Sequence, residues 1–184
     1  YNADTYIELE NLTISNNTAT MTGGGIYSQL PLKLNNINII ENTATEIGGY
    51  GGVEIRLNGL NNIFTNVVIS ENNGAGMLLS SYGYTYEPEG IYPKQSILNN
   101  VNINFNEGGG LYLRKTNITF TGGSINGNTG RTCISDCEPL LPTSSFGFGL
   151  KTYGCTDYSD LWDWCGDALF TITFTDVEIN ENPQ

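Results

Sequence analysis

The sequence predicts an all-β protein that folds as a parallel β-helix of about six coils with two loop insertions. Two observations predict this fold. A nine-residue motif recurs along the chain, and a glycine cluster that runs into a short apolar strand lies between successive copies. Repetition of this kind is the signature of a solenoid, in which each repeat buries its apolar face against its neighbours.

The repeated motif reads apolar-x-Asn-apolar-x-Ile-x-x-Asn. Its copies begin at Leu9, Leu34, Phe64, Leu98, Phe120 and Phe174. The closing Asn falls at positions 17, 42, 72, 106, 128 and 182, so the steps between copies are 25, 30, 34, 22 and 54 residues. Apolar and polar residues alternate with period two, which indicates strands rather than helices. A basal unit of about 22 residues holding about three short strands is typical of one β-helix coil, and the longer steps indicate insertions at turns.

Stacking of the coils explains why the same residue types recur at the same motif positions. One predicted column in the core contains Ile14, Ile39, Ile69, Ile103, Ile125 and Ile179. A second column contains Asn17, Asn42, Asn72, Asn106, Asn128 and Asn182, whose amides can hydrogen-bond to one another inside the molecule. A bend is predicted at Asn11, Asn36, Asn66 and Asn100. We expect the glycine clusters to supply turns with positive φ.

Composition and charge narrow the classes of partner. Of the 184 residues, 23 are Gly and 24 are Asn, and only 14% are charged. The net charge of −12 argues against nucleic acid or an anionic membrane surface as a partner. No apolar run approaches the ~18 residues that a membrane-spanning helix needs, so no membrane insertion is expected.

The sequence has no initiating Met, and its sixth repeat stops halfway through a coil. We therefore expect residues 1–184 to be a single β-helix segment of a longer protein. Because an uncapped coil leaves open strand edges, the expected partners are its own continuation or other protein subunits, joined by β-edge stacking.

Two stretches depart from the repeat. The first, residues 80–93, contains Tyr82, Tyr84, Tyr86 and Tyr92, which form either a stacking platform for sugars or partners, or a loop held by its own aromatic rings. The second, residues 131–168, contains both tryptophans, five aspartates and all four cysteines: Cys133, Cys137, Cys155 and Cys165.

The cysteines predict two disulfides, with three possible connectivities, and therefore an extracellular or cell-surface protein. Zinc is the alternative, but the spacing departs from that of most zinc sites and the chain has no His. No cofactor is expected, although the neighbouring aspartates could hold calcium. Trp162 begins a W-x-x-C sequence that matches the acceptor pattern for C-mannosylation.

Three sequons indicate N-glycosylation, in the expected order Asn117, then Asn16, then Asn11. Asn117 and Thr119 flank an inward-facing Ile118 and should face solvent. Asn16 lies on an outward turn, and Asn11 belongs to the predicted bend.

The pairing of a GG-apolar-apolar strand with an apolar-x-x-Asn turn, as in Gly108–Leu113 with Ile103–Asn106, resembles the repeats of chlamydial polymorphic outer membrane proteins and related right-handed parallel β-helix proteins. The resemblance covers nearly the whole chain outside the two insertions. It implies a right-handed coil and a surface adhesin or passenger-type role. The predicted disulfide-rich lobe departs from that pattern. A glycosylated eukaryotic surface protein is therefore expected at least as much as a bacterial one.

The function expected from these features is an extracellular structural or adhesive module of a coat, filament or cell-surface glycoprotein. The alternative is a carbohydrate-binding module whose ligand face carries Tyr27, Arg56, Tyr112 and Arg114. Pectinase-like β-helix enzymes use clustered Asp with His, and a lyase would need a calcium site beside a basic residue. The sequence completes neither arrangement, so we do not expect an enzyme.

Overall fold

A computed structural model describes residues 6–45, 49–57, 61–81, 95–114, 116–129, 150–153 and 172–180. All the regular secondary structure in these ranges is β-strand, and every strand pairing is parallel. The prediction of an all-β, parallel architecture is confirmed.

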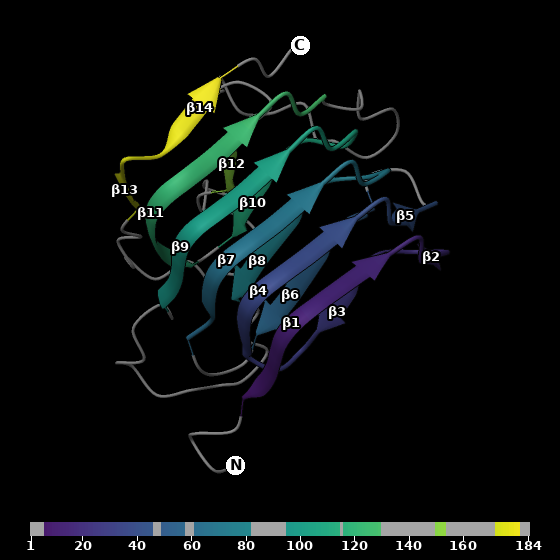
Figure 1. Cartoon of the computed structure of the whole chain (residues 1–184), viewed down its shortest axis with the longest axis horizontal. Helices are drawn as coiled ribbons and strands as arrows, with labels where there is room; N and C mark the ends of the chain where they lie inside the picture. Colours follow the sequence, from purple (N-terminus) through teal and green to yellow (C-terminus); the bar gives the residue numbers. More distant parts are fainter. Residues whose placement is uncertain are drawn as a thin grey trace, which may run out of the picture.

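The large sheet contains seven strands that lie side by side in the order of the sequence repeats (Figure 1). Its strands are β1 (Ile7–Ser15), β4 (Leu32–Ile40), β7 (Ile63–Ser70), β9 (Gln95–Asn104), β11 (Asn117–Asn126) and β13 (Ile172–Thr175), and β14 (Glu178–Asn180) also pairs with β11. Each long strand is one copy of the repeated motif, and the register between copies has no slip. The repeat is therefore the unit from which this sheet is built.

A second sheet of five strands lies behind the first in the view of Figure 1. In spatial order it contains β3 (Ile26–Ser28), β6 (Val53–Leu57), β8 (Met77–Ser81), β10 (Leu111–Arg114) and β12 (Leu150–Tyr153). These strands are the apolar segments that follow the glycine clusters. A third sheet has two strands, β2 (Thr18–Ala19) and β5 (Thr43–Ala44). In each of the first two repeats its strand follows the strand of the large sheet and precedes the strand of the second sheet. A parallel bridge from Thr43 to Asn73 extends it.

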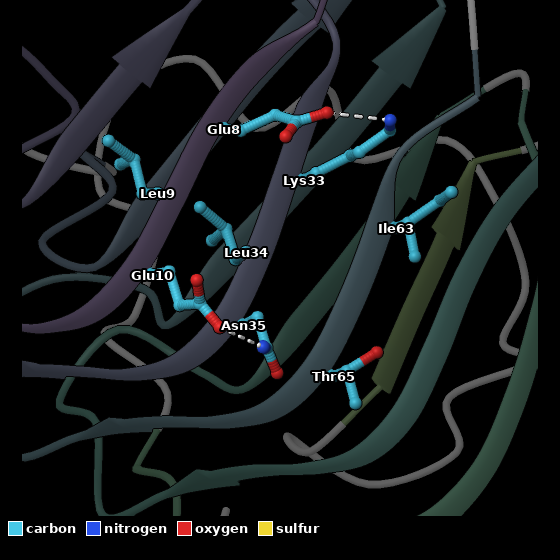
Figure 2. Close-up of a pocket in the computed structure, with 8 residues that line it drawn as sticks. All are labelled: Glu8, Leu9, Glu10, Lys33, Leu34, Asn35, Ile63 and Thr65. Carbon is cyan, nitrogen blue, oxygen red and sulfur yellow. Dashed lines mark hydrogen bonds and ion pairs between the residues drawn. The ribbon is translucent and has the colours of Figure 1, made fainter.

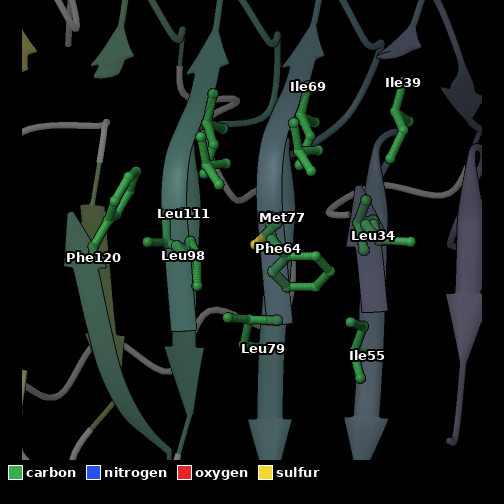
Figure 3. Packing of buried hydrophobic residues seen from close by; sticks show 14 of the residues in the cluster. Leu34, Ile39, Ile55, Phe64, Ile69, Met77, Leu79, Leu98, Leu111 and Phe120 are labelled. Carbon is green, nitrogen blue, oxygen red and sulfur yellow. The ribbon is translucent and has the colours of Figure 1, made fainter. Parts of the chain in front are cut away.

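The hydrophobic core is one cluster to which both sheets contribute, as Figure 3 shows. In the large sheet Ile14 pairs with Ile39, Ile39 with Ile69 and Ile69 with Ile103, and the last three side chains are fully buried. This confirms the predicted isoleucine column from Ile39 to Ile125, whereas Ile14 is half-buried and Ile179 is 41% exposed, so the prediction of a core position is wrong for Ile179. Full burial of a side chain of this size contributes ~1.5–3 kcal/mol, so successive repeats stabilise one another mainly through these columns.

The predicted asparagine column is a continuous hydrogen-bonded ladder from Asn17 to Asn128. The Oδ1 atom of Asn72 accepts the backbone N–H of Asn42 at 2.9 Å and its Nδ2 at 3.1 Å. The Nδ2 of Asn72 in turn donates to Asn106 Oδ1 at 2.8 Å and to the carbonyl of Ile39 at 3.1 Å. The same pattern links Asn17 to Asn42 and Asn106 to Asn128. Buried amides are thereby satisfied in full, which removes the desolvation cost that unpaired ones would carry.

The predicted bend is present and has a left-handed backbone. Asn11, Asn36, Asn66 and Asn100 all have φ between 53° and 56°. Asn is one of the few residues that adopts this conformation at small cost. Their side chains also stack, with Asn36 Nδ2 donating to Asn11 Oδ1 at 2.6 Å.

A second bend directly precedes the asparagine ladder, and although a turn was expected at Asn16, its left-handed backbone was not predicted. It is formed by Asn16, Glu41, Glu71, Phe105 and Gly127, with φ between 56° and 63°. The residue types at this position differ from one repeat to the next, so the sequence gives no pattern by which to recognise it.

The expected role of the glycine clusters is only partly correct. Gly23, Gly74 and Gly109 have positive φ, but the other cluster glycines within the described ranges do not. A Cβ on Gly52 would lie 2.2 Å from the carbonyl oxygen of Gly76 and 2.6 Å from Ile69 Cγ2. The main reason for glycine there is close approach: these residues pack directly against the next repeat and against the isoleucine column.

Most of the two predicted insertions lies outside the described residues, as do the four cysteines and Trp162. Two strands overlap the predicted boundaries. β8 ends at Ser81, inside the range 80–93, and β12 lies inside 131–168, where it pairs with β10. The second range is therefore not one continuous departure from the repeat.

We predict that Asn72→Ala lowers the free energy of unfolding by about 3 kcal/mol or more, because it leaves the two donors of Asn42 without their acceptor in a buried site. Denaturant unfolding monitored by circular dichroism measures the change. Asn99→Ala, on the half-buried outer side of β9, is the matched control and should change stability by less than about 0.5 kcal/mol. Equal effects of the two substitutions would contradict the ladder.

We also predict that Gly52→Ala lowers the free energy of unfolding by about 3 kcal/mol through overpacking, although its backbone φ is not in the left-handed region. Gly122 provides the contrast, because its φ is +65° and the nearest heavy atom to a Cβ there is 3.9 Å away. Gly122→Asn, which introduces the residue found at the equivalent bend of earlier repeats, should leave the melting temperature unchanged or raise it. The reverse order of stabilities would refute close approach as the reason for the cluster glycines.

Candidate ligand-binding face

The four residues of the predicted ligand face lie on two adjacent rows of the second sheet. The first row runs through Tyr27, Glu54, Leu78 and Tyr112, which pair in register. The second row runs through Arg56, Ser80 and Arg114. Both rows alternate with the buried Val53, Ile55, Met77 and Leu79 of the core and so belong to the outer side of this sheet. The side chain of Arg114 lies outside the described part.

Glu54 is the centre of the best-defined polar cluster on this face. It is 0% exposed, although it occupies an outer position. One carboxylate oxygen accepts a hydrogen bond from the Thr22 hydroxyl, and the other forms an ion pair with Arg56 Nε. A buried carboxylate is stable only when its oxygens are paired in this way.

Arg56 is held in place by Glu54 yet remains 47% exposed. Partial burial alone would lower the pKa of Arg56, but the hydrogen bond and the negative charge of Glu54, with smaller contributions from Tyr27 and Tyr50, outweigh that effect and raise it. Only Nε is engaged within the described part of the chain. The two terminal amino groups of this guanidinium are therefore positioned and available, and their planar fork matches a carboxylate.

Tyr27 lies directly beside this cluster, opposite Glu54 in the strand pairing. It is 46% exposed, and Gln29 Nε2 donates a hydrogen bond to its hydroxyl at 2.9 Å. A tyrosine tethered in this manner presents a flat apolar surface and a polar tip to solvent, next to a fixed cation. Together, Tyr27, Gln29 and Arg56 can bind a ring-shaped molecule that carries a carboxylate.

Tyr112 belongs to a different part of the same face. Its ring packs edge-to-face on Tyr50, with centroids 5.6 Å apart, and its hydroxyl donates to the carbonyl of Gly108 at 2.6 Å. Two strands, β6 and β8, separate it from Tyr27 in the sheet. Between Arg56 and Arg114, Ser80 is buried, and among the residues that the structure describes its hydroxyl has no hydrogen-bond partner. Tyr50 connects the two groups, because it packs on Tyr112, contributes to the raised pKa of Arg56, and donates its backbone N–H to the Thr22 hydroxyl at 3.3 Å.

A shallow depression of about 380 Å³ lies over β1, β4 and β7 of the large sheet (Figure 2). Its charged groups are already engaged by neighbouring side chains. Lys33 Nζ lies 2.7 Å from Glu8 Oε1 and 4.3 Å from the centre of the Tyr6 ring, and Asn35 Nδ2 donates to Glu10 Oε1 at 2.8 Å. The depression is a solvated polar surface and offers no unpaired charge to a ligand.

The three sequon asparagines lie at different levels of exposure. Asn16 and Asn11 are exposed on the two bends, whereas Asn117, at the start of β11, is half-buried. Asn11 accepts a hydrogen bond from Asn36, and Asn16 Nδ2 donates to Glu41 Oε2 at 3.2 Å. Ile118 is buried between Asn117 and Thr119, as the predicted alternation requires.

Across the ranges that the structure covers, no group of three or more acidic, Cys or His side chains is close enough to hold a metal ion. The aspartates that suggested calcium lie outside these ranges. In the same ranges no helix is long and apolar enough to cross a membrane.

The sequence analysis correctly predicted that Tyr27 and Arg56 lie on the outer side of the same sheet, but it did not predict that a buried Glu54 holds Arg56 in place. Burial of Glu54 depends on Thr22, which precedes the glycine cluster of the previous repeat. A Glu two residues before an Arg on the outer side of a strand could have indicated this ion pair. The alternation of apolar and polar residues, however, predicts that such a Glu is exposed to solvent.

No protein-family profile, curated protein sequence or solved structure matches this chain.

Proposed function

We propose that this chain is an extracellular structural or adhesive module, built on a right-handed parallel β-helix of about six coils. The observation that carries the proposal is the division between a repetitive interior and a varied exterior. Inward positions repeat Ile, Leu, Val, Phe and ladder Asn in register, whereas outer positions differ from one repeat to the next. Such a rod holds surface side chains at fixed spacing, which is what an adhesive or structural element needs.

The strand order supports a coil as the path of the chain. From β1 to β13 the chain passes repeatedly from the large sheet to the second sheet and back, through β2 and β5 in the first two repeats, and each strand pairs in parallel beside the equivalent strand of the previous repeat. Crossover connections between parallel strands are right-handed in nearly all proteins. The resemblance to repeats of surface β-helix proteins supports the same handedness and an exterior location. Two disulfides in the lobe and glycans on the sequons belong to this proposal, and so do neighbouring subunits or further coils as partners.

A second candidate function is carbohydrate binding, and the positioned guanidinium of Arg56 beside Tyr27 favours it. Sugar rings stack on aromatic faces through their C–H groups, and a uronate adds the carboxylate that a guanidinium binds in bidentate fashion. Catalysis is not part of either proposal, because the cluster contains one carboxylate whose two oxygens are both occupied. Glycosidic cleavage by the common routes requires a pair of such groups.

The adhesive proposal predicts that beads coated with the folded chain adhere to cell surfaces or to immobilised glycans, while beads coated with the unfolded chain do not. Material secreted from eukaryotic cells should also lose mass on glycosidase treatment. Polysaccharides recovered from the same incubations should have unchanged length. Absence of adhesion by the folded chain, or shortening of the polysaccharides, would overturn the proposal.

The carbohydrate-binding alternative predicts that Arg56→Ala weakens binding of an oligogalacturonate at least tenfold, because the substitution removes a charge-assisted bidentate contact. Arg56→Lys should give an intermediate loss, since a single ammonium cannot form the fork. Lys33→Ala removes the same charge from the other sheet and should leave affinity unchanged. Isothermal titration calorimetry makes the comparison, and equal losses for Arg56→Ala and Lys33→Ala would indicate nonspecific charge attraction instead.

A further inference from the structure

Phe105 is the one aromatic residue in the second left-handed bend. Its φ is 58° and its side chain is 61% exposed. The equivalent residues of the other described repeats are Asn16, Glu41, Glu71 and Gly127. A bulky side chain in this backbone conformation is unfavourable, and exposure of a large apolar ring adds nothing to folding. A residue that is costly on both counts indicates a role other than stability.

The ring of Phe105 has a fixed seat on the neighbouring repeat. A Cβ added to Gly127 would lie 2.5 Å from ring atoms Cδ1 and Cε1, so the ring packs directly over the bare backbone of that glycine. The backbone N–H of Phe105 donates to the carbonyl of Asn126 at 3.0 Å. The Cδ1–Cε1 edge of the ring is thus supported, while much of the side chain remains open to solvent.

A row of side-chain amides leads up to this seat along the outer side of β9 and β11. Asn104 precedes Phe105, and Asn126 lies beside it on β11. The hydroxyl of Ser124 links Asn102 Oδ1, at 2.8 Å, to Asn104, whose Nδ2 donates to Ser124 Oγ at 2.9 Å. These bonds fix the amides in position, but the Nδ2 groups of Asn102 and Asn126 donate to no partner in the described part of the chain.

We propose that Phe105 and the amides of Asn102 and Asn126 form a binding site for a neutral sugar ring. The phenyl ring, held along one edge, offers a face on which the C–H side of a pyranose stacks, and the two open N–H donors bind hydroxyl oxygens of the glycan. Carboxylates flank the site, with Glu71 at the same bend one repeat earlier and Glu178 beside Ser124. They accept sugar hydroxyls and repel a uronate, so this site selects uncharged glycans.

The site is independent of the Arg56 cluster. Arg56 lies on the second sheet, whereas Phe105 follows β9 of the large sheet. Loss of either site leaves the other intact, and the two differ in the charge of the glycan that they accept.

The test uses Phe105→Asn in the whole chain, because Asn is the residue found at this bend in the first repeat and suits a left-handed φ. We expect the variant to melt at the same or a higher temperature, yet to bind cellohexaose, mannohexaose or chitohexaose at least tenfold more weakly than the unaltered chain in a calorimetric titration. Glu41→Asn introduces Asn at the equivalent bend position two repeats earlier and should leave the melting temperature and the affinity for the oligosaccharide unchanged. Asn126→Asp, which keeps the shape but removes the donor and adds charge, should weaken binding without unfolding the chain.

Two results would overturn the proposal. The first is that none of the three neutral oligosaccharides binds the unaltered chain, or that they bind Phe105→Asn equally well. The second is a lower melting temperature for Phe105→Asn, which would make the ring a structural cover for Gly127. Oligogalacturonate binding through Arg56 is measured in the same samples and should be the same for all the variants.

Discussion

The constraint on which the rest of the structure depends is the vertical register of the repeats, which the asparagine ladder enforces. Each buried Asn donates to the Asn of the next repeat and to the carbonyl of the isoleucine column in the previous one. A slip of one residue would leave several buried donors unpaired at once, at ~1–3 kcal/mol each. Apolar columns favour stacking but tolerate several registers, whereas the ladder allows only one.

The ladder also determines where glycine is required. A Cβ on Gly25 would lie 3.2 Å from Asn42 Nδ2, and a Cβ on Gly76 would lie 2.8 Å from Asn106 Nδ2. The second sheet can approach the ladder and the isoleucine column only where its entering segment has no side chain. The glycine clusters and the ladder asparagines therefore depend on each other, because glycine leaves the space that the Asn side chains fill. Their contact brings the two sheets together around a single core.

Much of this could be predicted from the sequence, because interior columns must repeat when neighbours are copies of one another. Ile39 and Asn72 were predicted because their roles require the same residue type in every repeat, and the bend at Asn66 was predicted because Asn recurs there in four repeats. The second bend was missed, since at Glu41, Glu71 and Phe105 only the backbone conformation is shared and the side chains point outward. Burial of Glu54 was missed for a related reason: it depends on Thr22 of another repeat, a contact that no periodicity encodes.

The same distinction explains why candidate sites are found at exceptions to the repeat. An outer residue that follows local rules, such as Asn99, has no need of a fixed environment. Glu54 is a charge buried on an outer row, and Phe105 is an exposed ring on a strained bend. Each of these two residues costs free energy of folding, through desolvation of Glu54 and backbone strain at Phe105. The stability of the surrounding ladder and core offsets that cost. A scaffold whose register is fixed from within can hold such groups without losing its fold, and this capacity links the stability of the interior to binding at the surface.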